Sequence, residues 1–213
     1  LTYPQASNAP AATRVRVAQA AAAAPLKGDP GLGILGAGNY ATAVFLPNVQ
    51  KVGGVQKVAI ATASGVSARH AAQRYGFQIA SSSEDELFEA PDIQILALLT
   101  RHQHHARQVL AALAHGKHVF CEKPLAITPA ELDEIEAVLN GLNEKSPRVM
   151  VGFNRRFAPY SRELQRFLHN RSEPLAAHYR VNAGFLPPSH WLHDASQGGG
   201  RIIGEGCHFI DYL

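Results

Sequence analysis

The chain has 213 residues, of which 46% are hydrophobic and 17% charged, with a formal net charge of +3 and a pI of about 9.0. This composition is typical of a globular protein and excludes a disordered or collagen-like chain. The basic residues are scattered, which argues against nucleic-acid binding, and no apolar run approaches the roughly 18 residues that span a membrane. We therefore expect a cytoplasmic protein with neither a nucleic-acid nor a membrane partner. Cys121 and Cys207 form no CxxC pair, so neither a disulfide framework nor a zinc ribbon is implied.

Residues 1–30 are alanine-rich, are punctuated by four prolines and show no strand pattern, so we interpret them as a lead-in or linker. Arg14 and Arg16 precede the run Ala18–Ala24, an arrangement that faintly resembles a signal peptide. Alanine is only weakly hydrophobic and Gln19 interrupts the run, so the interpretation we favour is a helical or loose linker.

Short apolar runs alternate with helical sequence between residues 31 and 152. The apolar runs predict six strands, at residues 32–35, 58–62, 77–80, 93–100, 118–121 and 148–151. Helices are expected from the turn after the first strand to about Val49, where Pro47 should shorten or bend the helix, and at residues 67–75, 83–88, 104–115 and 129–140. Regular alternation of this kind predicts an α/β fold with a doubly wound, six-stranded parallel sheet, a Rossmann domain.

The pattern changes after Gly152. A helix is expected at residues 162–169 and a strand at 176–184, followed by the three glycines at 198–200. We interpret residues 153–213 as the start of a second, α+β domain that these 213 residues leave incomplete, because one strand cannot stabilise a domain. Tyr179 and Trp191 are candidates for lining a substrate pocket, and core packing explains them equally well.

A glycine-rich turn follows the first predicted strand. Gly36, Gly38 and Ala41, with Asn39 and Tyr40 between the last two, fit the pattern GxGxxA between a strand and a helix. Gly36 permits the tight turn, Gly38 lets backbone approach a pyrophosphate, and Ala41 lets the helix pack closely on the strand. The helix N-terminus offers free N–H groups to the phosphates, so the sequence predicts dinucleotide binding.

The choice of dinucleotide stays open. Many such turns are followed, about twenty residues later, by an acidic residue that binds the ribose hydroxyls and repels a 2′-phosphate. The second strand here ends in Thr62 and Ser64, whose hydroxyls repel nothing, and Arg69 lies close by. The sequence is therefore compatible with NAD or NADP.

Four further segments follow in order, and with the glycine turn they make the chain resemble the Gfo/Idh/MocA oxidoreductase family from about Leu32 to the last residue. They are Thr100–His105, Glu122-Lys123-Pro124, Gly152–Phe157, and Gly198-Gly199-Gly200 followed by His208 and Asp211. Within the family, the resemblance is to a branch in which this domain follows a zinc-type alcohol dehydrogenase-like region. Residues 1–30 would then be the linker between the two.

The resemblance implies roles for residues near the second and fourth of these segments. Lys123 would hydrogen-bond the reacting oxygen, and Lys123–Pro124 would be a cis peptide bond. His208 would accept the proton, since its free pKa lies near neutrality. Many members carry an aspartate at the position of Gly204, and the adjacent Glu205 would point about 100° away on a helix. Each residue also has an alternative without a catalytic role. Lys123 could be a solvated surface lysine, and His208 could be a helix residue whose ring hydrogen-bonds a neighbour.

The remaining expected cofactor contacts are Thr100, His102, His105, Glu122, Lys123 and Pro124. The resemblance places His105 near the nicotinamide or at the start of a helix. His102, His104 and His105 are all of a residue type that binds metals, but their spacing matches no known ligand pattern, so no metal site is predicted.

Two hypotheses for function follow. The first is an NAD(P)-dependent oxidoreductase that transfers hydride to or from a sugar, an inositol or a related polyol, and that could form a homo-oligomer through its second domain. The second is a cofactor-binding module without turnover, favoured by the incomplete second domain and by Gly204. A methyltransferase, which uses a similar glycine turn, is disfavoured by Glu122-Lys123-Pro124.

Overall fold

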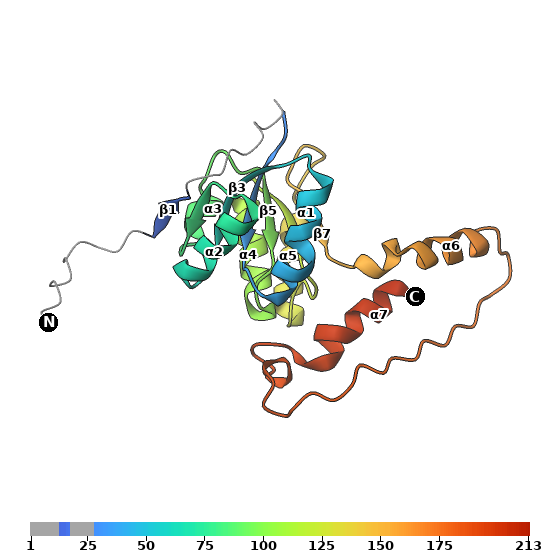
Figure 1. The fold of residues 1–213 in the computed structure, drawn as a ribbon. Coiled ribbons are helices and arrows are strands. Elements are labelled where there is room, and N and C mark those ends of the chain that lie inside the picture. The colour runs from blue at the N-terminus through green and yellow to red at the C-terminus, as the bar shows by residue number, and fades with distance from the viewer. Residues whose placement is uncertain (1–12, 18–27) are drawn as a thin grey trace, which may run out of the picture.

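The computed structural model describes residues 13–17 and 28–213, and its centre is a seven-stranded sheet in the order β1-β4-β3-β2-β5-β6-β7 (Figure 1). Strands β2 to β7 are mutually parallel, which confirms the predicted doubly wound fold and its six parallel strands. The strands are β1 (Arg14–Arg16), β2 (Gly31–Leu35), β3 (Gln56–Ala61), β4 (Ile79–Ser81), β5 (Ile95–Leu98), β6 (His118–Cys121) and β7 (Val149–Val151).

Strand β1 corrects the prediction that residues 1–30 contain no strand. It pairs antiparallel with β4, and the N–H of Val17 extends the pairing by donating to the carbonyl of Gln78 at 2.9 Å. The side chains of β1 are exposed, so its sequence lacks the apolar pattern of a buried strand. It is backbone pairing at the sheet edge that forms this strand. The predicted helix or linker at residues 18–24 lies outside the described residues.

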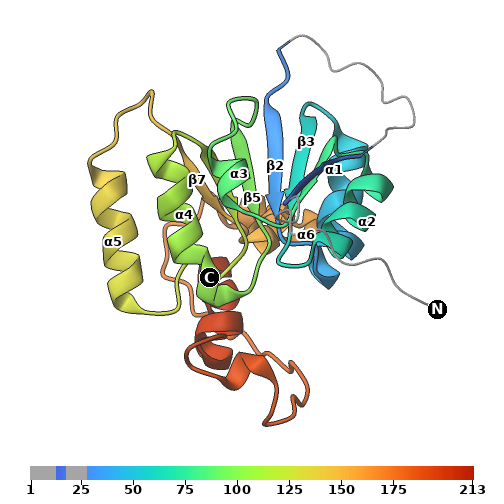
Figure 2. The same ribbon diagram turned by 90° about the vertical axis from the view of Figure 1, so that its left-hand side faces the viewer.

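Helices cover both faces of the sheet (Figure 2). The face toward α1 and α2 contains Ile34, Ile60 and Ala97, and the opposite face, toward α3, α4 and α5, contains their neighbours Leu35 and Leu98. Burial on both faces explains the continuous apolar runs of these strands. The helices are α1 (Leu46–Val52), α2 (Gly65–Tyr75), α3 (Asp85–Phe88), α4 (His105–Ala114) and α5 (Pro129–Asn140).

The helix after the glycine turn differs from the prediction. A π-helical turn at Ala41–Phe45 leads directly into α1, which continues to Val52. Pro47 lies at the start of α1, but the residues before it are already helical, so the N–H that proline lacks is missing beside the π-helical turn. Pro47 does not shorten the helix, and the irregularity lies just before it.

A buried lysine ties the loop before β5 to the start of β6. The ammonium of Lys117 donates to the carbonyl oxygens of Ala90 at 2.6 Å and Ile93 at 2.8 Å. Replacing Lys117 with Met keeps most of the side-chain length but leaves both acceptors without this partner. We expect the free energy of unfolding to fall by about 2–3 kcal/mol, as measured by urea denaturation. The same change at the exposed Lys145 is the control, and an equal effect there would contradict the assignment.

The chain after β7 extends beyond the carboxyl ends of the strands (Figure 2). Its elements are a 3₁₀ turn (Asn154–Phe157), α6 (Pro159–Leu168), a second 3₁₀ turn (Trp191–His193), a π-helical turn (Ile202–Gly206) and α7 (Cys207–Tyr212). The predicted strand at residues 176–184 is wrong. That segment runs as an open trace between α6 and the second 3₁₀ turn (Figure 1), with no ladder partner among the described residues, and a strand exists only through pairing.

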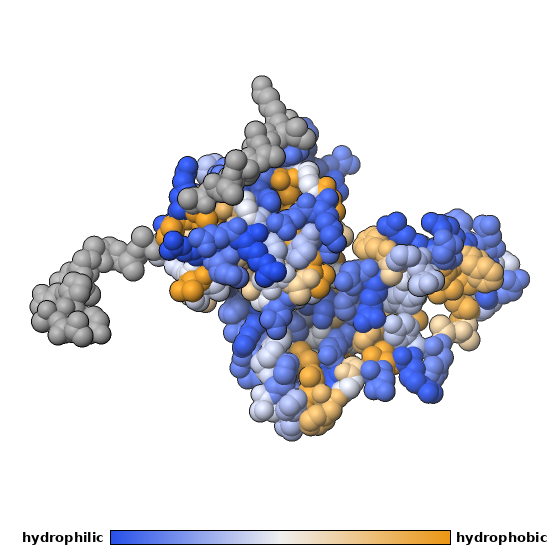
Figure 3. All heavy atoms as spheres, viewed as in Figure 1, coloured by the Kyte–Doolittle hydropathy of each residue, from blue (hydrophilic) through white to orange (hydrophobic). Residues whose placement is uncertain are grey.

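Helix α6 presents apolar side chains to solvent. Phe167 is 82% exposed and Leu164 is 47% exposed, and Figure 3 shows apolar surface over this part of the molecule. Tyr179 packs against α7 instead, with its ring 5.5 Å from that of Phe209 and 5.4 Å from that of Tyr212. Tyr179 thus has a packing role in this chain. No helix of the described residues is long and apolar enough to cross a membrane.

Candidate functional site

The glycine-rich turn connects the carboxyl end of β2 to the π-helical turn. At Gly36 φ is +99°, and a Cβ there would lie 2.6 Å from the carbonyl oxygen of Leu99, so a side chain is excluded. A Cβ on Gly38 would meet nothing within 4 Å, so this residue turns bare backbone outward. Ala41 is buried against Ile34 and its neighbours in the core. Each position has the property that a phosphate-binding turn requires.

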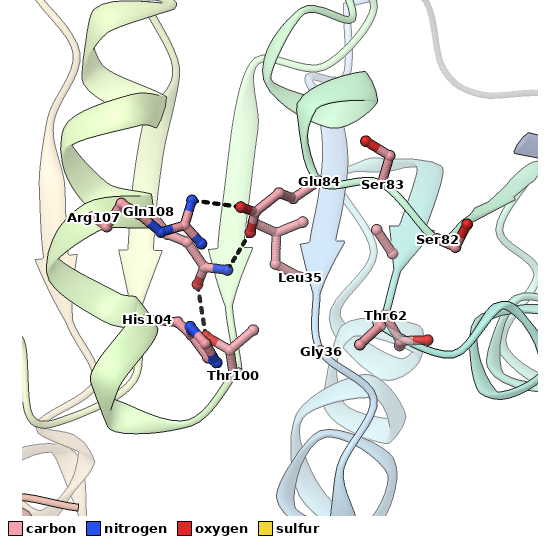
Figure 4. A pocket seen from close by; sticks show the side chains of 12 residues that line it. Leu35, Gly36, Thr62, Ser82, Ser83, Glu84, Thr100, His104, Arg107 and Gln108 are labelled. Atoms are coloured by element: carbon pink, nitrogen blue, oxygen red, sulfur yellow. Dashed lines mark hydrogen bonds and ion pairs between the residues drawn. The ribbon is translucent and has the colours of Figure 1, made fainter. Parts of the chain in front are cut away.

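A pocket of 430 Å³ opens beside this turn, at the carboxyl ends of β2 to β5 (Figure 4). Ligands of open parallel sheets bind at this edge, next to the point where the strand order reverses. Its lining combines small apolar residues with hydroxyls and one ion pair: Leu35, Gly36, Ala61, Thr62, Ala63, Ser82, Ser83, Glu84, Thr100, His104, Arg107 and Gln108.

Four of these side chains form a continuous chain of hydrogen bonds across one wall of the pocket (Figure 4). The hydroxyl of Thr100 donates to Oε1 of Gln108 at 2.6 Å, and Nε2 of Gln108 donates to Glu84 at 2.7 Å. The guanidinium of Arg107 donates to the other carboxylate oxygen of Glu84. Burial alone would raise the pKa of Glu84, but these two donors and the charge of Arg107 hold it below its ordinary value. Glu84 is therefore ionised at neutral pH.

The predicted cofactor residues divide between two places. Gly36, Thr62 and Thr100 line the pocket. Thr62 also hydrogen-bonds Ser67 at 2.8 Å, whereas Ser64 is exposed at the start of α2 and does not line the pocket. Gly38 and the neighbouring Asn39 are exposed at the turn itself. Ala41 lies in the core, and the remaining predicted residues lie farther along the edge of the sheet, near Lys123.

Lys123 follows β6 and reaches the C-terminal segment. Its ammonium donates to the carbonyl oxygen of Gly204 at 2.9 Å, and the Lys123–Pro124 peptide bond is cis, as predicted. His105, fully buried at the start of α4, contacts this loop. Its Nδ1 lies 2.7 Å from the carbonyl oxygen of Pro124, and its Nε2 lies 3.1 Å from that of Thr100. Burial lowers the pKa of His105. The two carbonyl oxygens oppose this effect. The ring lies between the loops that follow β5 and β6, and in its neutral form it donates to only one of the two carbonyls, because a neutral imidazole has a single N–H.

Glu122 and Tyr40 face one another between the glycine turn and the Lys123 loop. Burial raises the pKa of Tyr40, as does the charge of Glu122, and burial likewise raises the pKa of Glu122. Oε1 of Glu122 is buried and has no hydrogen-bond partner among the described residues. A buried carboxylate oxygen without a partner is costly. This oxygen lies beside Gly152, where a Cβ would be only 2.8 Å from it.

His102 connects the loop after β5 to the C-terminal segment. Its Nδ1 lies 2.9 Å from the carbonyl oxygen of Gly198, and its ring meets the edge of Trp191 at a centroid distance of 4.8 Å. Burial, together with the charge of Lys123, lowers the pKa of His102 to about 4. His102 is therefore neutral at pH 7 and donates from Nδ1 to the carbonyl.

The same packing explains Gly204. A Cβ at this position would lie 2.6 Å from Cδ1 of Leu192 and 3.0 Å from Cε1 of His102. The side chains of Leu192 and His102 thus fill the space that a side chain at residue 204 would need. An aspartate here would require His102 and Leu192 to move.

His208 lies in α7, and its ring is 6.0 Å from that of Phe153. Burial and the charges of Lys123 and Arg155 lower its pKa, against an opposing effect of Asp211. Nδ1 of His208 is buried without a hydrogen-bond partner among the described residues. The structure therefore places a neutral imidazole within the field of Lys123, with one ring nitrogen unpartnered.

Glu205 does not reach His208. Its carboxylate accepts from Nε of Arg201 at 2.8 Å, one helical turn away. Asp211 pairs with Arg156. Neither carboxylate orients the imidazole through a hydrogen bond.

Sequence reasoning missed Glu84, Arg107 and Gln108. Gln108 carried a signal, because it shares the helical spacing of His105 and Ala112 on the buried side of α4. A buried glutamine on such a face needs polar partners, and it finds them in Thr100 and Glu84. The pairing of Glu84 with Arg107 joins residues 23 positions apart and had no local pattern.

Comparisons with known proteins agree with this geometry. Residues 31–153 match the Gfo/Idh/MocA oxidoreductase family, described by its NAD-binding Rossmann fold. A levoglucosan dehydrogenase from Pseudarthrobacter phenanthrenivorans is 30% identical over 164 residues, 74% of this chain and 41% of that protein. A 1,5-anhydro-D-fructose reductase from Ensifer adhaerens is 30% identical over 188 residues, 85% of this chain and 54% of that protein.

Solved structures share the fold. The crystal structure of an NAD-binding protein from Listeria innocua superposes with a TM-score of 0.72 at 23% identity, covering 87% of this chain and 54% of that one. The chain thus spans about half the length of the relatives it matches.

Proposed function

The chain belongs to the Gfo/Idh/MocA oxidoreductase family, and from this we propose that it binds NAD or NADP and takes part in hydride transfer to or from a sugar, an inositol or a related polyol. We further propose that residues 31–152 hold the cofactor and that residues 153–213 contribute to the substrate side. Two relatives are named for acting on anhydro sugars, levoglucosan and 1,5-anhydro-D-fructose, which supports a sugar-like substrate.

Two observations support the fit of a dinucleotide. The open space outside Gly38 gives a pyrophosphate access to backbone N–H groups, and the buried Oε1 of Glu122 lacks the partner that a ribose hydroxyl or carboxamide would supply. The residues that would hold the cofactor are Gly36, Gly38, Asn39, Tyr40, Ala41, Thr62, Thr100 and Glu122, with Ser64 at the margin. His102, His105 and Pro124 do not contact the cofactor in this proposal. They position the loops after β5 and β6.

When bound, the nicotinamide supplies the carbon that accepts or donates hydride. The observation that carries the proposal is that the ammonium of Lys123, beyond the end of β6, binds the carbonyl oxygen of Gly204 at 2.9 Å, four residues before His208 in the chain. The ammonium of Lys123 hydrogen-bonds the substrate oxygen and stabilises negative charge on it. His208, neutral because its pKa is lowered, accepts the hydroxyl proton at a ring nitrogen during oxidation and returns it during reduction.

A second candidate, cofactor binding without turnover, also has support. Nδ1 of His208 lacks a partner among the described residues, and Glu205 pairs with Arg201. An imidazole that nothing orients transfers protons poorly, since catalytic groups are held within a fraction of an ångström.

A turnover assay tests the proposal and separates the two candidates. The chain is incubated with NAD or NADP and with levoglucosan, inositols and hexoses, and the absorbance of the reduced nicotinamide is followed. Turnover with a sugar or polyol is the expected result for the oxidoreductase. Binding of NAD or NADP by calorimetry with no turnover supports the second candidate. Failure to bind either dinucleotide contradicts both.

Three further features are kept as proposals. Association of identical chains through residues 153–213 is supported by the exposed apolar side chains of α6, such as Phe167. A cytoplasmic location and a fusion to a zinc-type alcohol dehydrogenase-like region stay predictions from the sequence.

A further inference from the structure

The wall of the pocket formed by Thr100, Gln108, Glu84 and Arg107 has no part in the hydride-transfer chemistry. From it we infer that Arg107 is the platform on which the adenine ring of the dinucleotide lies, and that Glu84 and Gln108 hold this platform in place. The inference rests on the proposed function, because it names the part of the dinucleotide that this wall receives.

The first argument is charge. A 2′-phosphate is bound best by an unpaired cation, but the charge of Arg107 is already matched by Glu84. The carboxylate of Glu84, whose pKa is held low, would moreover repel a phosphate placed against it. This end of the pocket therefore favours the uncharged end of the ligand, while the bare backbone at Gly38 is available to the phosphates.

The second argument is preorganisation. Arg107 is bound by Glu84, Glu84 by Gln108, and Gln108 by Thr100, which lies just beyond β5 (Figure 4). Gln108 is buried, and each end of its amide has a partner, so its orientation is determined. A guanidinium held in this way binds with little further loss of side-chain entropy.

The third argument is shape and surface. The side chain of Arg107 is 58% exposed even though it is paired, so a face of the guanidinium remains open. A flat guanidinium stacks on aromatic rings. The small residues Ala63, Ser82 and Ser83 also line the pocket and leave room for a flat ring. Figure 4 shows Ser82 and Ser83 on the side of the pocket away from Arg107.

The test compares NAD with nicotinamide cytosine dinucleotide, which differs from NAD only in its base. We expect the wild-type chain to bind NAD more tightly, because a purine offers the larger stacking surface. Arg107→Ala should lower the affinity for NAD by about tenfold and reduce the preference for NAD over the cytosine analogue. Arg107→Lys keeps the charge but loses the flat group, so it should behave like Arg107→Ala. Dissociation constants are measured by calorimetry.

Each outcome has one meaning. If the wild-type chain binds neither NAD nor NADP, the proposed function fails, and this inference fails with it; if it binds only NADP, the Arg107 variants are compared for their affinity for NADP. If the wild type binds NAD and Arg107→Ala binds it equally well, the inference alone is overturned. An equal loss for both dinucleotides would show an effect on the pocket as a whole and would also overturn it, as would full retention of affinity by Arg107→Lys. Glu84→Gln, which breaks the ion pair, should reproduce part of the loss.

Discussion

Replacing Lys123 with Met is expected to lower kcat by about 10²–10⁴, with a much smaller effect on the KM for NAD or NADP. Methionine keeps a long, unbranched side chain but cannot hydrogen-bond the reacting oxygen or stabilise charge on it. Lys123 lies away from the pocket beside the glycine turn, so dinucleotide binding should largely survive. Steady-state kinetics with a substrate found in the turnover assay measures both constants.

The pH profile separates a chemical role of Lys123 from a structural one. The charge of Lys123 is one of the groups that lower the pKa of His208. Removing a nearby cation makes protonation easier, so the pKa of His208 rises in Lys123→Met. The acid limb of kcat/KM for alcohol oxidation, which requires neutral His208, should then move to higher pH. The change Lys145→Met at an exposed position controls for the loss of one positive charge. Wild-type kcat and an unmoved limb would show that Lys123 serves only to hold the carbonyl of Gly204.

The fold was predictable because its signals are local. Runs such as Ile95–Leu98 are apolar throughout since both faces of the central strands are covered. The capping box of Thr128 and Glu131 begins α5 as expected. The predictions for β1 and for residues 176–184 were wrong for the same reason. Strand β1 formed where none was predicted, and the strand predicted at 176–184 did not form. A strand forms only when another strand pairs with it, and β4 offers an edge to Arg14–Arg16 whereas nothing among the described residues pairs with 176–184.

The candidate site was predictable only where a motif fixes the backbone. Gly36 and Gly38 have the geometry that their spacing implies, because a turn of this shape excludes a side chain at Gly36. The surroundings of Gly204 were not predictable, because His102 and Leu192 reach it from distant parts of the chain. The ion-pair partner of Glu205 could not be predicted either. A spacing of four residues to Arg201 permits an ion pair, but only packing decides whether that pairing or another forms.

Replacing Gly38 with Asp is expected to reduce the affinity for NAD and NADP by at least about 100-fold, since a carboxylate would stand where the pyrophosphate approaches the backbone. The fold should be unaffected, because a Cβ at this residue meets nothing within 4 Å. This distinguishes Gly38 from Gly36, where a side chain would meet the carbonyl of Leu99 and would disturb the sheet itself. Titration calorimetry gives the affinities, and urea denaturation should give an unchanged free energy of unfolding.

The isosteric variant Gly38→Asn separates charge from bulk at the same position. Its side chain has the size of aspartate without the negative charge, so it should lose less affinity than Gly38→Asp, and the difference between the two should shrink as salt is added, because salt screens an exposed charge. If both variants lose affinity equally at all salt concentrations, crowding and not charge excludes the phosphates. If Gly38→Asp binds NAD and NADP as tightly as the wild type does, the dinucleotide does not cross this turn, and the pocket beside it binds something else.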